Sequence, residues 1–344
     1  MNSKEPSILM IYTGGTIGMI LDPVTGRHKP FELDHLIHAV PELARFNFDI
    51  HTRSFGEPID SSDVQPQLWS DLARVILEKY DDYDGFVILH GTDTMAFTAS
   101  ALSFMIPELD KPVILTGSQL PIGMIRTDGK ENLITALQIA ASKNSMGAAR
   151  VPEVAIYFDS FLFRGNRSHK SSTQHLNAFS SPNMAPLAEA GVQILFYDRR
   201  ILPPSTNGLS ILDKYDDRIG VLPFFPGMSP DYYEPTIKNE QTRALMLMSY
   251  GSGQAPNDRK LLKLLKDEVD RGKIIVNVTQ CAQGMVDQTR YENGARLHHA
   301  GVIGARDLTY EAALTKLMVL LANFPDHEVA ERFTKSWRGE LTES

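Results

Sequence analysis

The 344-residue sequence contains only one cysteine, Cys281, so no disulfide can form within the chain. The first residues also lack the long apolar stretch and the small-residue cleavage site of a signal peptide. A chain without disulfides and without such a signal is typical of a reducing compartment, and we expect the protein to be located in the cytoplasm. We expect Cys281 itself to be a small buried hydrophobic residue.

Long apolar runs and basic blocks are missing as well. No stretch approaches the ~18 apolar residues that a membrane-spanning helix needs. The net charge is −8, and lysine and arginine are not clustered. Nucleic acid and anionic membranes are therefore not expected as partners. Histidine, cysteine and the carboxylates form no convincing metal motif, so we expect no metal.

The residues that are present are those of a soluble globular protein, with 42% hydrophobic and 22% charged residues. The first half repeats one rhythm, in which a short apolar run is followed by a Gly/Thr/Ser loop and an amphipathic segment. The runs lie at residues 7–12, 84–90, 111–117 and 153–159. Continuous apolar runs separated by helical patterns indicate parallel strands covered on both faces. The sequence therefore predicts a doubly wound, flavodoxin-like α/β sheet that is mostly parallel.

Residues 193–212 interrupt this rhythm with proline, serine, threonine, asparagine and glycine, which is typical of a connection between domains. We therefore expect an N-terminal α/β domain over residues 1–192 and a smaller C-terminal α/β domain over 213–344. In the second domain we predict strands at 220–225, 244–250 and 273–280 and helices at 259–272 and 310–324.

The glycine loop TGGTIG at residues 13–18 directly follows the first predicted strand. Thr13 stands where the dinucleotide motif G-x-G-x-x-G needs its first glycine, and the acidic residue expected about 20 positions later is absent. The G-K-[ST] of a phosphate-binding loop is absent too. The loop is therefore either a plain strand-to-helix turn or a turn that exposes the Thr16 hydroxyl.

Three further polar loops have ordinary explanations when each is taken alone. HGTDT at 90–94 could simply cap a helix, residues 163–172 could be a solvated basic loop, and DSSD at 60–63 could form an Asx-turn. Loops that leave the carboxyl ends of parallel strands meet at one edge of the sheet. We therefore expect these loops to bring two threonines, a carboxylate, a lysine and paired serines together.

TGGTIG together with HGTDTM at 90–95 resembles the bacterial-type L-asparaginases. Further matching segments lie at 115–121 (LTGSQLP), 164–170 (RGNRSHK), 179–183 (FSSPN), 249–257 (SYGSGQAPN), 276–281 (VNVTQC) and 300–317 (AGVIGARDLTYEAALTKL). The resemblance covers essentially the whole chain, and the two threonine motifs are highly specific as a pair. Without a signal peptide, the chain most resembles the cytoplasmic type I branch.

The resemblance implies that L-asparagine and water give L-aspartate and ammonia, with Thr16 as the nucleophile. Thr92, Asp93 and Lys170 would form the second catalytic group. A threonine hydroxyl attacks only when a base takes its proton. Lys170 can help if burial neutralises it or if it stabilises deprotonated Thr92. Backbone N–H groups of the glycine and GTD loops are the natural donors to the tetrahedral oxyanion.

The resemblance also implies how the substrate is held. Asp93 would bind the α-amino group, and Ser61 and Ser62 would bind the α-carboxylate. Asp60 and Thr92 would also be among the substrate-binding residues. Members of the family form intimate dimers, sometimes paired into tetramers, so a homodimer or homotetramer is implied. No cofactor is needed for this chemistry.

The sequence departs from the family at two places. The mobile loop after the glycine turn, here residues 20–30, contains no tyrosine, although the family places one there to orient the nucleophile. Thr25 is a weak substitute for it. In type I enzymes with an allosteric asparagine pocket, an arginine precedes the SYG turn, where this chain has Met248. Methionine cannot bind a carboxylate bidentately, so we expect that response to be absent or altered.

Two other functions stay open at this point. The chain could be a broader amidohydrolase that also uses glutamine, because one methylene is worth only about 1–3 kcal/mol of discrimination. An amidotransferase component that acts with tRNA is disfavoured, since no extra tRNA-binding domain is evident. The scaffold could also be a non-catalytic amino-acid sensor, although a sensor would not need two threonines and a lysine.

Overall fold

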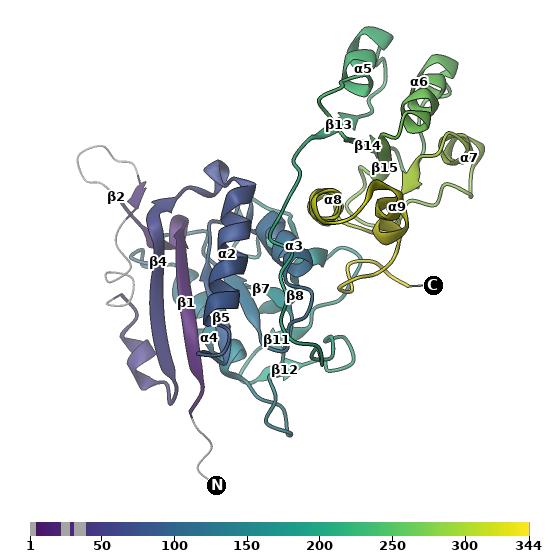
Figure 1. Ribbon diagram of the computed structural model, residues 1–344. Coiled ribbons are helices and arrows are strands. Elements are labelled where there is room, and N and C mark those ends of the chain that lie inside the picture. Colours follow the sequence, from purple (N-terminus) through teal and green to yellow (C-terminus); the bar gives the residue numbers. More distant parts are fainter. Residues whose placement is uncertain (1–4, 22–27, 31–38, 344) are drawn as a thin grey trace. The chain divides into compact units, whose positions relative to one another are not determined.

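The computed structural model describes residues 5–21, 28–30 and 39–343. Two compact units make up the chain, residues 1–213 and residues 214–344 (Figure 1). The boundary lies next to the end of the predicted connection at 193–212. Ile194–Phe196, at the start of that segment, form an edge strand of the first unit.

An eight-stranded sheet forms the first unit, with the strand order β12-β11-β8-β7-β6-β5-β1-β4. Five of its strands are parallel: β4 (Asp49–Ile59), β1 (Ser7–Gly14), β5 (Gly85–Leu89), β6 (Val113–Thr116) and β7 (Val154–Phe158). Every residue of β1 and β5 is buried, as expected for strands covered on both faces. The expected mostly parallel α/β sheet is confirmed.

Three antiparallel strands extend the sheet beyond β7: β8 (Phe161–Arg164), β11 (Ala188–Ala190) and β12 (Ile194–Phe196). The change of direction happens in the tight turn between β7 and β8. Asp159 and Ser160 have φ of 44° and 72° there, the left-handed geometry that two-residue hairpin turns require. Asn132 Oδ1 accepts the Asp159 N–H at 3.1 Å and holds this turn.

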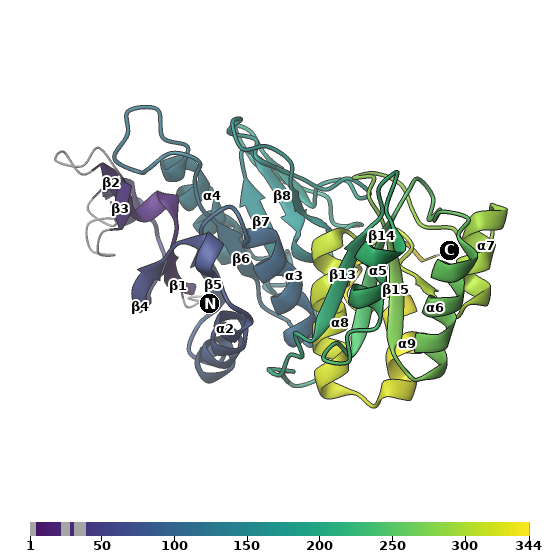
Figure 2. The same cartoon turned by 90° about the horizontal axis from the view of Figure 1, so that it is seen from above.

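Helices cover both faces of the sheet: α2 (Pro66–Lys79), α3 (Met95–Met105) and α4 (Gly129–Ala141). Side chains alternate between faces along a strand, and Ile8 and Met10 of β1 share a core with Leu133 and Leu137 of α4. Figure 2 shows α4 on one side of the sheet and α2 and α3 on the other. The doubly wound expectation is therefore confirmed.

A separate four-stranded parallel sheet forms the second unit, in the order β13 (Ile219–Pro223), β14 (Ala244–Ser249), β15 (Ile274–Thr279) and β16 (Ile303–Gly304). Its helices are α5 (Pro230–Ile237), α6 (Arg259–Asp270), α7 (Glu292–His299), α8 (Tyr310–Asn323) and α9 (Asp326–Thr334). Asp258 caps α6 by accepting the N–H groups of Lys260 and Leu261. Within the described part of the chain, no helix has both the length and the apolar character needed to cross a bilayer.

Cys281 is exposed, so the expectation that it is buried was wrong. The strand β15 ends at Thr279, and the chain then leaves the cover of the sheet. The Cys281 N–H donates to Thr279 Oγ1 at 3.0 Å, which fixes the backbone in a turn and leaves the thiol outside.

Candidate active site

The glycine loop after β1 presses against the loop after β5. Gly14 and Gly15 have φ of 127° and 88°. A Cβ on Gly15 would lie 2.4 Å from the Cα of Gly91, so a side chain could not fit there. The chain then enters the 3₁₀ turn η1 (Thr16–Gly18), where Thr16 is half-buried. No other residue in the described ranges hydrogen-bonds the Thr16 hydroxyl.

Lys170 joins the two polar residues of the loop after β5. It lies in the short strand β9 (His169–Lys170), which pairs with β10 (Phe179–Ser180). Lys170 Nζ is 2.7 Å from Thr92 Oγ1 and 2.6 Å from Asp93 Oδ1. The Lys170 side chain is 15% exposed and that of Asp93 60%. The ammonium is thus sheltered, while the Asp93 carboxylate stays open to solvent.

Ser61 connects a third loop to the same place. It is buried at the start of the 3₁₀ turn η3 (Ser61–Asp63), and its hydroxyl oxygen accepts the Asp93 N–H at 3.3 Å. Its carbonyl accepts the Thr94 hydroxyl at 2.7 Å. A Cβ on Gly91 would lie 2.5 Å from Ser61 Oγ, so glycine is needed for this approach as well.

Asp60 and Ser62 are exposed and bind each other. Asp60 Oδ1 accepts both the N–H and the hydroxyl of Ser62, each at 2.9 Å. This contact is the Asx-turn that also explains the segment without any catalytic role. The structure therefore brings Ser61 directly against the loop at residues 91–93. Asp60 is connected to that loop through Ser61, its neighbour in the chain.

Gln119 is a polar neighbour of Thr92 that was not among the residues expected at the site. Thr92 Oγ1 donates to Gln119 Oε1 at 3.2 Å, so the hydroxyl accepts from Lys170 and donates to Gln119. Asp128 fixes the Gln119 backbone by accepting the N–H groups of Gln119 and Leu120 at 2.9 and 3.0 Å. Gln119 follows β6, and the rule that loops after parallel strands share an edge could have identified it.

Two expectations fall outside this cluster. Thr25, the substitute for the missing tyrosine, lies outside the described residues. Met248 lies half-buried in β14 of the second unit, where its carbonyl accepts the Gln280 side-chain amide at 2.7 Å. The thioether has no donor with which to hold a carboxylate. Among the described residues, no group of His, Cys, Asp and Glu is placed to hold a metal ion.

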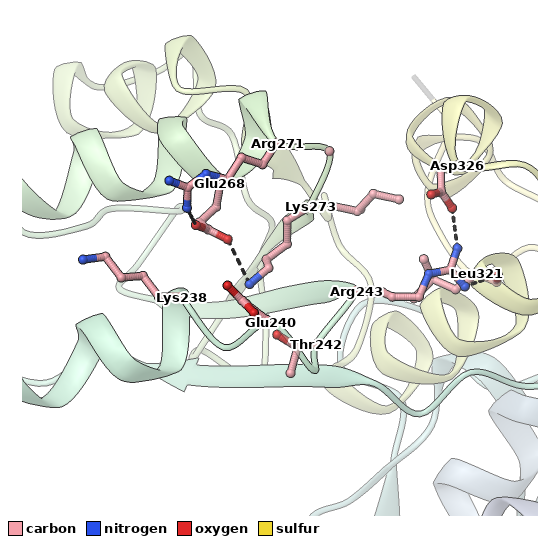
Figure 3. Close-up of a pocket in the computed structure, with 11 residues that line it drawn as sticks. Lys238, Glu240, Thr242, Arg243, Glu268, Arg271, Lys273, Leu321 and Asp326 are labelled. Atoms are coloured by element: carbon pink, nitrogen blue, oxygen red, sulfur yellow. Dashed lines mark hydrogen bonds and ion pairs between the residues drawn. The ribbon is translucent and has the colours of Figure 1, made fainter.

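A charged cavity of about 430 Å³ in the second unit contains none of these residues (Figure 3). Each of its four cationic side chains already contacts a carboxylate. The pairs are Lys238–Glu234, Arg243–Asp326, Arg271–Glu268 and Lys273–Glu268. Arg271 and Lys273 share Glu268, so most of the positive charge in the cavity is already paired, and the cluster in the first unit is the stronger candidate site.

Comparison with known proteins agrees with this choice. The family model described as Asparaginase, N-terminal matches residues 7–202, and that of the Glutaminase/Asparaginase C-terminal domain matches residues 218–333. L-asparaginase 1 of Escherichia coli K12 is 43% identical over 352 residues, which cover 98% of this chain and 99% of the relative. The expected resemblance to a type I L-asparaginase is confirmed.

Two solved structures share the fold over the whole length. L-asparaginase I from Vibrio cholerae is 39% identical with a TM-score of 0.88, covering 99% of this chain and 100% of that one. The thermostable L-asparaginase from Thermococcus kodakarensis is 35% identical, also with a TM-score of 0.88, covering 98% and 100%. The threonine loops, the lysine between them and these full-length similarities place the chain in the asparaginase family.

Proposed function

We propose that this chain hydrolyses L-asparagine to L-aspartate and ammonia, with Thr16 as the nucleophile. The observation that carries the proposal is the bridge from Lys170 Nζ to both Thr92 Oγ1 and Asp93 Oδ1. A buried hydroxyl that accepts a hydrogen bond from an ammonium loses its proton more readily than a free one, because the positive charge stabilises the alkoxide.

The reaction proceeds by acyl transfer. Once the Thr92–Lys170 pair has released one proton to solvent, Thr92 is an alkoxide beside the ammonium. Thr16 Oγ attacks the side-chain carboxamide carbon, and this alkoxide takes the proton that Thr16 loses. The tetrahedral oxyanion collapses when the C–N bond breaks, and the proton returns to the leaving nitrogen, which departs as ammonia. A water molecule then attacks the acyl carbon, with its proton taken by the same pair. This second attack releases aspartate and restores the Thr16 hydroxyl.

The substrate's charged groups find complementary partners in the cluster. Asp93 binds Lys170 through Oδ1, which leaves Oδ2 for the α-ammonium group. The Ser61 hydroxyl, which accepts the Asp93 N–H, donates its own proton to the α-carboxylate. The Ser62 hydroxyl donates to Asp60 Oδ1 in this structure, and it turns from Asp60 to the α-carboxylate when substrate binds. Asp60 would repel that carboxylate, so its role is to hold the Ser62 backbone through the bond from the Ser62 N–H.

We further propose that the protein works in the cytoplasm and as a homodimer or homotetramer. A free, exposed thiol at Cys281 fits a reducing compartment. The assembly follows only from membership in the family, and light scattering of the purified protein tests it directly.

Steady-state kinetics with L-asparagine and L-glutamine side by side test the activity. We expect ammonia and aspartate in equal amounts from asparagine, and slower release from glutamine. Equal kcat/KM for both amides would favour the broader amidohydrolase. Binding of asparagine without any ammonia release by folded protein would favour the sensor and overturn the proposal.

A further inference from the structure

His90 is a buried titratable residue next to the site, and the reaction proposed above does not use it. It follows β5 directly and is 1% exposed. Its Nδ1 lies 2.7 Å from the Gly91 carbonyl oxygen, and its Nε2 lies 2.9 Å from Thr98 Oγ1 in α3. Trp69 Nε1 of α2 lies 3.0 Å from the same Thr98 oxygen.

The chemistry of these partners fixes every proton in the chain of bonds. A carbonyl oxygen only accepts, so Nδ1 of His90 carries the hydrogen. Nε2 of the neutral ring is then an acceptor, and the Thr98 hydroxyl donates to it. The Trp69 N–H can only donate, and the Thr98 oxygen accepts it. Burial lowers the pKa of His90 to about 4, which keeps the ring neutral at physiological pH.

The Gly91 carbonyl belongs to the Gly91–Thr92 peptide, which begins the loop that holds Thr92 and Asp93. The peptide is planar and trans, so a carbonyl directed at His90 turns the Thr92 N–H to the opposite side. Within the described ranges, no group accepts a hydrogen bond from that N–H. A Cβ on Gly91 would meet both Ser61 Oγ at 2.5 Å and the Cα of Gly15 at 3.2 Å, so Gly91 is packed tightly against both loops.

We infer that His90 is a positioning residue that sets the Gly91–Thr92 peptide. Its Nδ1–H holds the carbonyl inward, which presents the Thr92 N–H to the substrate's developing oxyanion and keeps Thr92 Oγ1 within reach of Lys170. The inference rests on the proposed function of Thr92. It concerns the chemical step more than substrate binding, because an oxyanion donor acts most strongly in the transition state.

Two amide substitutions separate positioning from mere burial. His90→Asn places an amide nitrogen where Nδ1 stands, whereas His90→Gln places its amide one bond farther, near Nε2. We expect His90→Asn to stay within about twofold of the wild-type kcat. We expect His90→Gln to lower kcat about fivefold or more, with KM changed less than twofold, since one neutral hydrogen bond is lost.

A second pair tests the chain of bonds if either amide variant fails to fold. Thr98→Ser keeps the hydroxyl and should match the wild type, while Thr98→Val removes the donor to Nε2 and should lower kcat. Imidazole ¹⁵N NMR of the wild type should show a protonated Nδ1 and an unprotonated Nε2 on His90 at pH 7.

An Nε2–H tautomer, or equal kcat values for His90→Asn and His90→Gln, would overturn the inference while leaving the asparaginase activity intact. Equal kcat values for Thr98→Ser and Thr98→Val would do the same. Wild-type protein that releases no ammonia would overturn the proposed function, and with it this role for His90.

Discussion

Lys170 Nζ donates to Thr92 Oγ1 at 2.7 Å, although 78 positions separate the two residues in the chain. The bond joins the short strand β9 to the loop after β5, and a second bond from the same nitrogen reaches Asp93. One cation therefore touches both the proposed proton acceptor and the proposed ligand of the substrate's amino group.

Replacing Lys170 with methionine keeps the length of the side chain and removes its charge. We expect kcat for L-asparagine to fall by about 10²–10⁴, because the Thr92 hydroxyl loses the group that favours its deprotonation. Lys143→Met is the matched control, since Lys143 pairs with Asp84 in the same unit and contacts none of the proposed site residues. A Lys170→Met enzyme with half the wild-type kcat would remove Lys170 from the mechanism.

Gly15→Ala tests whether the two threonine loops must touch. The new Cβ would lie 2.4 Å from Gly91, so the loops must separate, and we expect kcat to drop by about 100-fold, as misplacement by about 1 Å does elsewhere. Gly147→Ala is the control, because Gly147 has a similar φ of 79° with nothing within 4 Å of the new Cβ. It should show the cost of backbone strain in thermal denaturation and leave kcat unchanged. Equal losses of kcat in both variants would contradict the contact.

A buried ion pair lies in the second unit. Lys316 and Glu340 are both fully buried, with Nζ 2.5 Å from Oε1, and burial lowers the pKa of Lys316. Lys316→Met leaves the carboxylate without its partner, and we expect a loss of about 3–5 kcal/mol in the free energy of unfolding. Lys266→Met breaks an exposed pair with Asp270 and should cost less than about 1 kcal/mol. Urea denaturation of both variants checks the contrast, and equal losses would refute it.

The burial of His90 should also make the free energy of unfolding depend on pH in the acid range. Its folded pKa of about 4 lies below the model-peptide value of 6.5, so the unfolded chain binds a proton first as the pH falls. The stabilisation is complete above pH 6.5 and is lost as the pH drops through about 4, in total about 3 kcal/mol. His90→Asn lacks this loss. Between pH 7 and pH 4.5 the free energy of unfolding should therefore fall more in the wild type than in His90→Asn. Equal decreases in the two proteins would contradict the buried neutral ring.

Much of the fold could be predicted from the sequence because its central strands are continuous apolar runs. Residues 7–12 and 153–159 could be assigned without any tertiary information, and they form β1 and β7. The edge strand β4 could not be predicted in this way, because its eleven residues are exposed or half-buried and contain no apolar run. The burial of Cys281 was predicted wrongly because its exposure depends on where strand β15 ends.

The polar loops could be predicted to meet, since carboxyl ends of parallel strands share an edge, but their hydrogen bonds could not. Gln119 and His90 have partners 27 and 8 positions away, on other elements, and no local pattern marks such pairs. The glycines of both loops were visible in the sequence. Their purpose, the close approach of Gly15 to Gly91, appears only when the strands are side by side.

The rate of ammonia release from L-asparagine by wild type and Thr16→Ala, each shown to be folded by circular dichroism, tests the central claim most directly. Without its nucleophile the enzyme cannot form the acyl intermediate, and we expect a decrease on the order of 10⁴ or more in kcat. The wild type should release ammonia and aspartate in equal amounts. A Thr16→Ala protein within tenfold of the wild-type rate would contradict catalysis by Thr16.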